Sequence, residues 1–553
     1  MSVDGGIVLE RHDQLDLALY RRIAFEHAPI SLSPALLDTV QRSRTALLAH
    51  LESGASAYGV NTGLGLLANR SVAPDDQAAF QRSILAGRAA GTGPPLSEAV
   101  VRGAMLLRLT GFLSGYAGVT AELCQFIADR LNDRWYPVVP GGVSGAAGEI
   151  VPLAHLFGTL VGDGSVFSSG GSVPARGVSA FSSGGSAATS GRSVAAPGLP
   201  SRREVVDAAT ALAQRGIAPY ELEAKEGIAL INGAPLAPAL AVPLARRAEA
   251  LLDHATLCGA LSIALTGASP RPYTPRIGEL KGDPGQLAIH RQLWSLLQPT
   301  PDRLQDARQA PVSLRVIPQV HGAAASLLDH LRAQLERELR AVTDSPVYLP
   351  AADGEPDGLY STGNFHAQYL VLLFDATLVA FTQVVNALEK RLHRLLDSRF
   401  SGLPDQLTPD PGRQSGVVVL HKQVIGLAAH ARTLAAPASV HVIEGSTGQE
   451  DFESHALLAA QQLDGVLSLL ELALAHELVA LRQARFLAGA ELIGSPSSSS
   501  SWPALLEEAI SRVAEVVPPV AEDRSLAGDI ERVRDLVASG QLIGGVRSPS
   551  IWS

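Results

Sequence analysis

Two short stretches carry side chains suited to removing a proton from a carboxylate substrate. The glycine-rich loop AYGVNTGLG (57–65) contains Tyr58, and a phenol acts as a general base where nearby charge or hydrogen bonds favour its anion. In SLRVIPQVHG (313–322), Arg315 offers a planar fork that binds a carboxylate, with Gln319 in the same stretch. The alternatives are a plain turn for the first stretch and a structural salt bridge for the second.

Two further stretches place polar side chains directly before long apolar segments. STGNFHAQ (361–368) contains Asn364 and His366, whose uncharged polar groups suit the orientation of a zwitterion. GSTGQEDFES (445–454) contains Gln449, Glu450 and Asp451. For both stretches the simpler alternative is the capping of a helix start and compensation of its dipole.

The elements that position these groups are predicted to be long helices. Apolar residues recur at spacings of three and four over much of the chain from residue 200 onward, which is the spacing of one face of a helix. The pattern predicts helices over 323–342, 367–397 and 455–485. The centre of each is apolar on nearly every side, which indicates burial among other helices. We therefore expect a mainly α protein with an elongated bundle, packed against bundles of other copies. The alternative is a set of core helices in a monomer.

The first part of the chain is more broken. Glycine-rich loops occur at 57–65 and 86–95, and residues 165–200 are rich in Ser, Gly and Ala, which predicts a surface excursion with little fixed structure. We expect a smaller, loop-rich N-terminal domain over 1–200, followed by the helical bundle and C-terminal helices over 201–553.

Composition narrows the classes of protein. Of the 553 residues, 46% are hydrophobic and 18% charged, which is typical of globular proteins, and the net charge of -10 argues against a nucleic-acid surface. The only cysteines, Cys124 and Cys258, provide neither a disulfide framework nor zinc-ligand spacing. No apolar signal region is expected at the start of the chain, and we expect no run of transmembrane length. We expect a cytoplasmic protein with no metal, membrane or nucleic-acid partner.

The order of the sequence blocks is more specific than any one of them. YGVNTGLG, GxxxGAxGExxPLAH, AKEGIALING (224–233), SLRVxPQVHG, GNFHAQ and GQED follow one another between about residues 50 and 460. In this the chain resembles the aromatic amino acid ammonia-lyase family, which includes histidine, tyrosine and phenylalanine ammonia-lyases and related aminomutases. The resemblance implies a fumarase-like helical fold and a homotetramer whose active sites, each built from three subunits, act on a small-molecule amino acid or betaine.

In that family an Ala-Ser-Gly tripeptide cyclises and dehydrates into a methylidene-imidazolone electrophile, which activates the amine for departure. Here the matching tripeptide is Ala146-Ala147-Gly148. Without a serine hydroxyl no water is lost and the methylene cannot form, so we expect no cofactor. Two explanations remain: a natural enzyme that works without the electrophile, or an ordinary ammonia-lyase carrying a serine-to-alanine change.

Further departures favour natural loss of the electrophile. Val312 stands where the family usually has a tyrosine, Ala234 where it has a threonine, and Gly87-Arg88 at the pair that sets substrate selectivity. A single engineered change would not carry these along.

An enzyme without the electrophile needs a substrate whose leaving group requires no activation. A quaternary ammonium meets this need, as in ergothionase, the family member that converts the betaine ergothioneine to thiourocanate and trimethylamine. The chain is similar in lacking the tripeptide serine, which predicts elimination of trimethylamine from a histidine-derived betaine. The alternatives are a histidine or aromatic amino acid ammonia-lyase inactivated by Ser-to-Ala change, and an electrophile-free cyclase or conjugate-addition enzyme of a biosynthetic pathway. A purely binding protein would not need the retained base and anion grip.

The resemblance also implies roles by position. For Arg88 the resemblance implies contact with the substrate ring, and the alternative is that this arginine forms a structural ion pair. The implied roles are Tyr58 as base, Arg315 as carboxylate grip with hydrogen bonds from Asn232 and Asn364, Gln449 and Glu450 at the substrate ring, Arg88 reading that ring, Gly63 and Gly65 allowing loop closure, and Gln319 in the substrate site.

Overall fold

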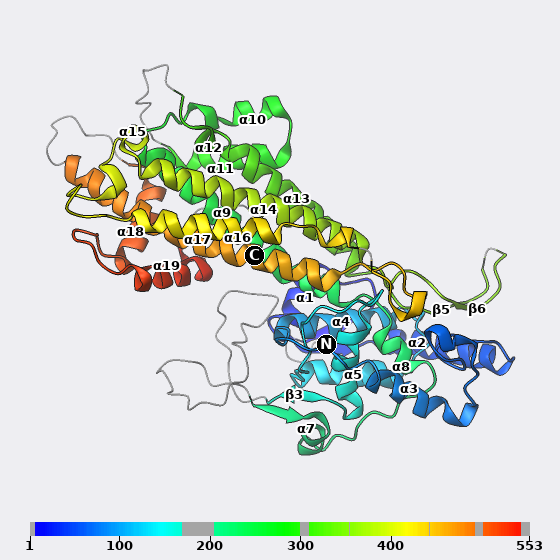
Figure 1. Ribbon diagram of the computed structural model, residues 1–553. Coiled ribbons are helices and arrows are strands. Elements are labelled where there is room, and N and C mark those ends of the chain that lie inside the picture. Colours follow the sequence, from blue (N-terminus) through cyan, green and yellow to red (C-terminus); the bar gives the residue numbers. More distant parts are fainter. Residues whose placement is uncertain are drawn as a thin grey trace.

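Two bodies of different build make up the chain, a set of long helices and a set of shorter ones (Figure 1). The computed structural model describes residues 6–168, 204–298, 309–352, 354–441, 443–492 and 502–543. The mainly α prediction is confirmed. From residue 169 on, the predicted surface excursion at 165–200 lies outside the described residues.

The long helices pack along one another and form the bundle. Helix α17 contacts α14, α9 and α16, and α13 contacts α11, α14 and α9. Shorter helices cover the bundle at its ends and sides. The bounds are α9 (Leu236–Leu265), α10 (Pro275–Lys281), α11 (Pro284–Leu296), α12 (Val312–Arg315), α13 (Ile317–Glu338), α14 (Gln368–Leu395), α15 (Ser398–Ser401), α16 (Val418–Leu434), α17 (Ala456–Leu492), α18 (Ala504–Val516) and α19 (Ala527–Ser539).

The three predicted helices are present with shifted ends. The segment predicted at 367–397 is α14, and that at 455–485 is α17, which continues to Leu492. The segment predicted at 323–342 is α13, which begins at Ile317 and ends at Glu338. It begins earlier because Pro318 lies in its first turn, where proline's missing N–H has no helical partner to lose.

The N-terminal body is built from shorter helices around α4, which contacts α1, α2 and α5. Its central helix is almost wholly buried, with apolar side chains on all sides. The bounds are α1 (Leu17–Ala24), α2 (Pro34–Glu52), α3 (Gln77–Ala86), α4 (Glu98–Leu113), α5 (Ala121–Asn132), α6 (Ile150–Gly158), α7 (Ala208–Gln214) and α8 (Glu226–Ile231).

Strands are short and paired locally in the described part of the chain. Strand β1 (Ile7–Leu9) pairs in parallel with β2 (Ile30–Leu32), placing Ile7 opposite Ile30. Strands β3 (Ser165–Phe167) and β4 (Val205–Asp207) are antiparallel. So are β5 (Val347–Leu349) and β6 (Gly358–Tyr360). Each pair closes a loop and none forms a core sheet.

Helices α7 and α8 follow residue 200 but belong with the N-terminal elements. Helix α8 contacts α3 and α6, and α7 contacts β3 and β4. The bundle begins at Leu236 with α9, which also contacts α4 and so joins the two bodies. Sequence composition placed the division at 200 because the Ser/Gly-rich stretch ends there.

The expectation that no run is long enough to span a membrane needs correction. Residues 226–265 and 368–395 are long and apolar enough by length and composition. In the first, 94% of the apolar window is buried inside the protein, and in the second 61%. Buried core helices pass the same test, because packing on all sides demands the same apolar surface.

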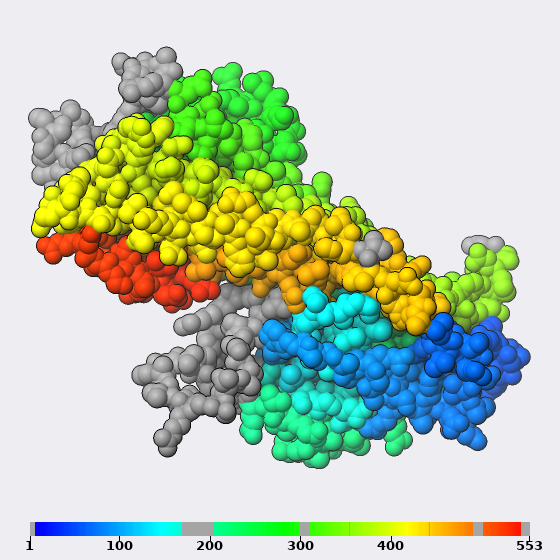
Figure 2. All heavy atoms as spheres, in the orientation of Figure 1, coloured from blue at the N-terminus to red at the C-terminus, as the bar shows by residue number. Residues whose placement is uncertain are grey.

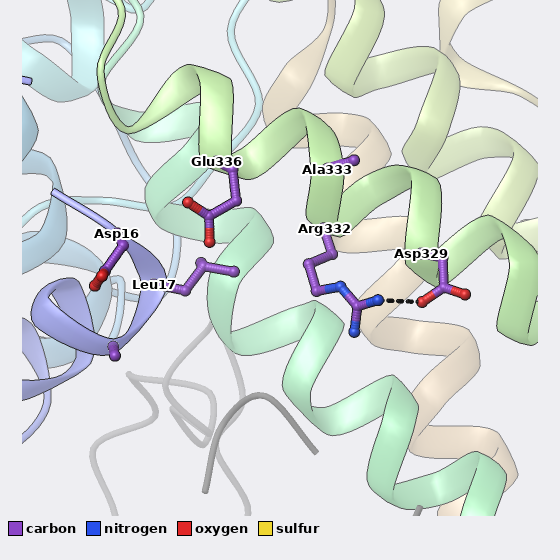
Figure 3. Close-up of a pocket in the computed structure, with 7 residues that line it drawn as sticks. Asp16, Leu17, Asp329, Arg332, Ala333 and Glu336 are labelled. Atoms are coloured by element: carbon purple, nitrogen blue, oxygen red, sulfur yellow. Dashed lines mark hydrogen bonds and ion pairs between the residues drawn. The ribbon is translucent and has the colours of Figure 1, made fainter. Parts of the chain in front are cut away.

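A hollow of about 330 Å³ lies between the start of α1 and α13 (Figure 3). Asp16, Asp329 and Glu336 border it, and Leu17 lines its wall. These carboxylates are already engaged: Asp16 caps α1, Asp329 pairs with Arg332 on α13, and Glu336 pairs with Arg340 just beyond the end of that helix. None of the sequence-predicted site residues lines this hollow.

Candidate active site

The loop that carries Tyr58 is held in shape by its own backbone and by one amide side chain. Asn61 accepts from Ala57 N (2.7 Å) and donates to Ala55 O (2.8 Å). Gly65 has φ of +56°, in the left-handed region that favours glycine, and its N–H donates to the Tyr58 hydroxyl at 3.0 Å. Tyr58 is half-buried. A donated N–H stabilises negative charge on the phenol oxygen, which suits a base.

The tripeptide lies just before α6 and is partly buried. Ala147 N donates to Glu450 Oε2 at 2.9 Å, so a segment 303 residues away closes over it. A Cβ on Gly148 would lie 3.4 Å from the Phe365 ring. With a methyl group at position 147, these residues do not fit the methylidene-imidazolone of the resembling family, because no hydroxyl is present to eliminate.

Glu450 lies in a turn that brings the Tyr58 loop and the tripeptide together. Its Oε1 accepts from Ser446 Oγ at 2.7 Å, and the 3₁₀ turn Ser446–Gly448 contacts the turn Gly65–Asn69 that follows Tyr58. The space-filling view shows the residues just before α17 lying over the N-terminal body (Figure 2). The Tyr58 loop, the tripeptide and Glu450 are therefore connected, through the Gly65 turn on one side and through Ala147 N on the other. Gln449, beside Glu450, is exposed.

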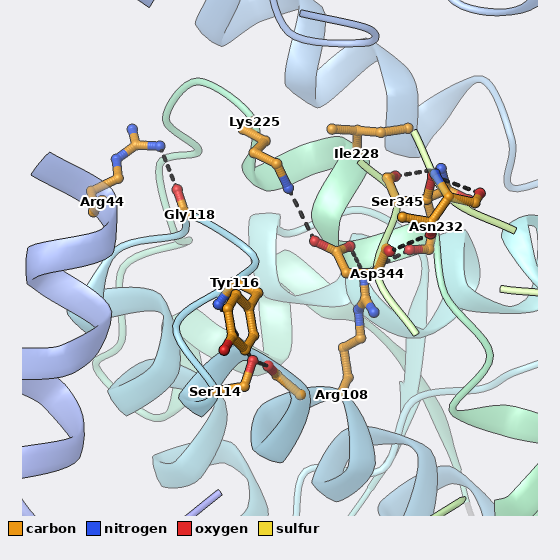
Figure 4. Close-up of polar contacts among 12 residues, drawn as sticks. Arg44, Arg108, Ser114, Tyr116, Gly118, Lys225, Ile228, Asn232, Asp344 and Ser345 are labelled. Carbon is orange, nitrogen blue, oxygen red and sulfur yellow. Dashed lines mark hydrogen bonds and ion pairs between the residues drawn. The ribbon is translucent and has the colours of Figure 1, made fainter. Parts of the chain in front are cut away.

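Asn232 ends α8 and is fixed by its backbone and side chain (Figure 4). Its carbonyl accepts from Arg108 Nη2 at 3.0 Å, and its Nδ2 donates to Ser345 O at 2.6 Å. Asp344, next to that serine, bridges Arg108 (2.6 Å) and Lys225 (3.0 Å). Two cations and one carboxylate thus hold the Asn232 turn.

This charged cluster is deeply buried. The side chain of Lys225 is 0% exposed, and those of Arg108 and Asp344 are each 3% exposed. Burial lowers the pKa of both Lys225 and Arg108, while the nearby Asp344 opposes the shift. Lys225 also has φ of +73°, which turns the chain sharply into α8. Lys225 belongs to the AKEGIALING block, but no role was predicted for it.

Glu149 follows the tripeptide directly and ties it to the bundle. Its two carboxylate oxygens accept from Leu236 N and Ala237 N, each at 2.6 Å, at the start of α9. Burial raises the pKa of Glu149 to about 8, which these two hydrogen bonds and Arg108 oppose. This role was not predicted, although Glu149 is the glutamate of the GxxxGAxGExxPLAH block.

Asn364 and Gln449 lie in exposed turns and do not cap helices. Asn364 Nδ2 donates to Val342 O at 3.3 Å, and α14 begins only at Gln368, with no side-chain cap. The capping alternative for Asn364 is therefore wrong. Helix α17 begins at Ala456, well beyond Glu450, whose oxygens bind Ala147 N and Ser446 Oγ instead of the helix start.

Arg88 lies in the loop between α3 and α4, close to the tripeptide segment. The same loop contacts residues 141–142, through Gly141 N to Pro94 O and Gly142 N to Thr92 O, both 2.8 Å. Gly91 N donates to His155 Nε2, also at 2.8 Å. Within the part of the chain that the structure describes, the Arg88 side chain makes no ion pair. The alternative that Arg88 forms a structural ion pair is therefore not supported there.

Arg315 and Gln319 lie apart from these groups in a single chain. Helix α12, which ends at Arg315, is at the opposite end of the bundle from α2 and α3 (Figure 1). Helix α13 separates it from the Asn232 turn, and 22 residues of helix span about 33 Å. Arg315 Nε donates to Ala310 O at 2.9 Å, and Gln319 is exposed.

A possible metal-binding group lies outside the site, on α14 and α16. Ligand atoms of Glu389, His393 and His421 all lie within 4.8 Å of one another. His421 Nε2 is 2.8 Å from Glu389 Oε1, and Lys390 pairs with the other oxygen at 2.6 Å. The glutamate is thus satisfied by protein partners. No metal site was expected from the sequence, and none of these three residues was among the predicted site residues.

Both cysteines, Cys124 and Cys258, are buried and free. Burial raises their pKa values, so neither thiol is poised as a nucleophile.

Comparison with known proteins adds a family match that covers most of the chain. The family model for aromatic amino acid lyases matches residues 15–507. A histidine ammonia-lyase from Anaeromyxobacter sp. (strain K) is 34% identical over 541 residues, covering 96% of this chain and 98% of that protein. One from Sorangium cellulosum is 35% identical over 547 residues, covering 96% and 97%.

Solved structures with the same fold include two with different described activities. Histidine ammonia-lyase from Trypanosoma cruzi has a TM-score of 0.80 at 25% identity, covering 98% of this chain and 94% of that one. The ergothioneine degrading enzyme ergothionase from Treponema denticola has a TM-score of 0.85 at 22% identity, covering 97% and 100%. The second likeness, at that identity, concerns the fold alone.

Proposed function

Because the chain belongs to the aromatic amino acid lyase family, we propose that it is a carbon–nitrogen lyase that eliminates trimethylamine from a histidine-derived betaine such as ergothioneine, without an electrophilic cofactor. The observation that carries the proposal is Ala147. A methyl group at the centre of the tripeptide supplies no oxygen to expel, so an amine that already carries its charge must leave unaided.

The reaction balances with the protein's own groups. The Tyr58 oxygen takes the proton β to the carboxylate, and that C–H electron pair forms the carbon–carbon double bond. The C–N bond breaks, its electrons go to nitrogen, and trimethylamine leaves neutral. The cationic nitrogen supplies the leaving-group activation, and the base contributes roughly 10²–10⁴ in rate. No oxidant or metal is required.

Within the described residues of one chain, Arg315 lies too far from the Asn232 turn for both to hold the same substrate carboxylate. Since α13 separates Arg315 from the Asn232 turn, we assign the grip to Arg315 of the partner subunit in a homotetramer. Exposed large apolar side chains on the bundle support such an assembly, because large exposed apolar patches are uncommon on monomers. They are Tyr369, Leu372 and Val379 on α14, and Val419 and Ile425 on α16.

Other residues orient the ring and carboxylate. Asn232 and Asn364 bind the two ends of the segment 342–345. The side-chain amide of Asn232 donates to Ser345 O, and that of Asn364 donates to Val342 O. Arg88, without an ion-pair partner in the described chain, suits an anionic or thiolate-bearing ring. Glu450 reaches the imidazole from the tripeptide side.

A second candidate is an ordinary histidine ammonia-lyase that carries alanine in place of the catalytic serine. The curated relatives at 34% and 35% identity, described as histidine ammonia-lyases, favour it. It predicts that the unmodified gene encodes serine at position 147.

The test is incubation of the purified protein with ergothioneine, following trimethylamine release and absorbance of the unsaturated product. A Tyr58→Phe variant is the control for background decay. Trimethylamine from wild type, at least a hundredfold faster than from the variant, supports the proposal. Ammonia from histidine would instead support the second candidate, and absence of trimethylamine at every pH would remove this substrate.

A further inference from the structure

Near the tripeptide, one buried carboxylate makes no hydrogen bond to any residue that the structure describes. Glu453 is 3% exposed, and neither of its side-chain oxygens has a hydrogen-bond partner in the described part of the chain. Burying a charged group without compensation is strongly unfavourable. Its neighbour Glu450 differs, because both oxygens of that residue are bonded within the protein. An unsatisfied buried acid of this kind needs a functional or structural explanation.

The carboxylate faces the site already described. A Cβ built on Gly445 would lie 3.3 Å from Glu453 Oε1 and 3.3 Å from Gly145 O, so both oxygens border the same small volume. Gly145 immediately precedes the tripeptide, whose Ala147 N is bonded to Glu450. The Glu453 carboxylate therefore lies next to the segment that in the family holds the substrate's amine.

The local chemistry selects for positive charge. Burial, and then the charge of Glu450, raises the pKa of Glu453 to about 7, which indicates that the site lacks a cation of its own. Aromatic side chains occur on the same segments: Phe365 lies against Gly148, and Phe452, the residue before Glu453, has its ring 5.8 Å from that of His366. Carboxylates combined with aromatic faces suit a trialkylammonium group, which offers charge but no N–H to donate.

We propose that Glu453 forms a subsite for the cationic nitrogen of the substrate, replacing the family's covalent hold on the amine by an electrostatic one. This rests on the proposed function, and deepens it by naming the group that the chain uses to recognise the substrate class. The family's GQED block does not include this position, so the resemblance assigns it no role.

The subsite acts in binding and not in bond breaking. The positive charge on nitrogen disappears as trimethylamine leaves, so a fixed anion stabilises the bound substrate at least as well as the transition state. Loss of the anion should therefore raise KM and leave kcat unchanged or slightly higher. A residue with a purely structural role would lower kcat or stability instead.

The experiment measures binding by titration calorimetry in the Tyr58→Phe background, so that no ligand is consumed. The probes are histidine betaine and imidazolepropionate, which shares the ring and carboxylate but lacks the cationic nitrogen. Glu453→Gln removes the charge at nearly constant shape, and Glu444→Gln removes one from an exposed position in the same loop. We expect Glu453→Gln to weaken betaine binding at least tenfold and imidazolepropionate binding less than twofold.

The outcomes separate this proposal from the proposed function. Equal weakening of both probes, or no weakening of the betaine, overturns the subsite even if wild type releases trimethylamine. Selective weakening of the betaine supports the subsite even if wild type releases none, in which case the proposed reaction alone fails. Thermal unfolding of Glu453→Gln serves as the folding check, and we expect it to be no less stable than wild type, since no hydrogen bond is lost.

Discussion

From the buried charged cluster next to Asn232 we predict that Asp344→Asn strongly lowers the free energy of unfolding. This change keeps the shape of the side chain but removes the one carboxylate that bridges Lys225 and Arg108. Both cations stay buried, and the protein offers no second carboxylate within ion-pair distance of either in its described part. The variant must therefore keep two like charges together in a medium that solvates them poorly.

The expected loss of stability is large. Removing one partner of a buried ion pair typically costs about 3–5 kcal/mol, because the remaining charge is left uncompensated. The lysine provides partial relief, since it can deprotonate while the arginine cannot. Burial already lowers the pKa of Lys225, and without Asp344 the pKa falls further.

The pH dependence follows from that direction. A base whose folded-state pKa lies below its unfolded value binds fewer protons when folded, so stability rises with pH between the two values. In Asp344→Asn this window extends to lower pH than in wild type. The stability deficit of the variant should therefore be greatest at low pH and shrink as pH rises.

The assay is equilibrium urea unfolding at one fixed protein concentration, because assembly makes apparent stability concentration-dependent. The matched control is Asp329→Asn, which breaks an exposed pair with Arg332 (2.5 Å) and should cost less than about 1 kcal/mol. Lys225→Met, which leaves Asp344 paired to Arg108, should cost less than Asp344→Asn. A cost for Asp344→Asn no larger than that of the exposed control, or a deficit that grows with pH, would refute this reasoning.

Four further predictions concern the site and the packing. The intact mass of the purified chain should equal the mass calculated from its sequence, without loss of water at Ala147, by mass spectrometry. Tyr58→Phe should lower turnover by roughly 10²–10⁴ in a steady-state assay. Because burial, and then the charge of Glu450, raises the pKa of Glu453 from 4.5 to about 7, wild-type stability should fall as pH rises through that window, and Glu453→Gln should become steadily more stable relative to wild type between pH 5 and 8 in urea unfolding. Gly322→Ala should destabilise by about 1–3 kcal/mol, since its Cβ would lie 2.5 Å from Gln286 Cα where α13 meets α11.

Each of these has a clear contrary result. A mass deficit equal to lost water would show a cyclised tripeptide, and unchanged turnover in Tyr58→Phe would assign the base elsewhere. A flat pH response of Glu453→Gln relative to wild type would mean that the Glu453 carboxylate has an ordinary pKa. Wild-type stability in Gly322→Ala would show that the helices can separate at little cost.

The long helices were predictable because their apolar spacing extends over many turns. The ends were less so: α13 begins at Ile317, where a proline in the first turn is the local signal. The helix-cap interpretation of Asn364 failed because the helix begins four residues later, and nothing in the short sequence STGNFHAQ marks that offset. The apolar run 226–265 is buried inside the protein. Its sequence alone does not distinguish such a core helix from a membrane-spanning one, because both are apolar on every side.

The proximity of some candidate site segments was predictable from the order of the sequence blocks, whereas the roles of their residues stay predictions. Tyr58, the tripeptide and Glu450 come together as that order implies, although they lie up to 392 residues apart. Glu453 was missed because an acidic residue in a polar turn gives no sign of burial until the segment closes over Gly145. Lys225 and Asp344 were missed for a related reason, since 119 residues separate two charges that meet only in the fold.

The three attachments of the tripeptide segment have a consequence for how position 147 can change. Hydrogen bonds from residues 141–142 to the 92–94 loop anchor it upstream, Glu149 anchors it to α9 downstream, and Ala147 is held through its backbone amide. None of these contacts uses the side chain at 147. The path of the backbone at residue 147 therefore does not depend on the side chain there. Exchange between alanine and serine changes whether a hydroxyl is present for chemistry and leaves the surrounding contacts in place.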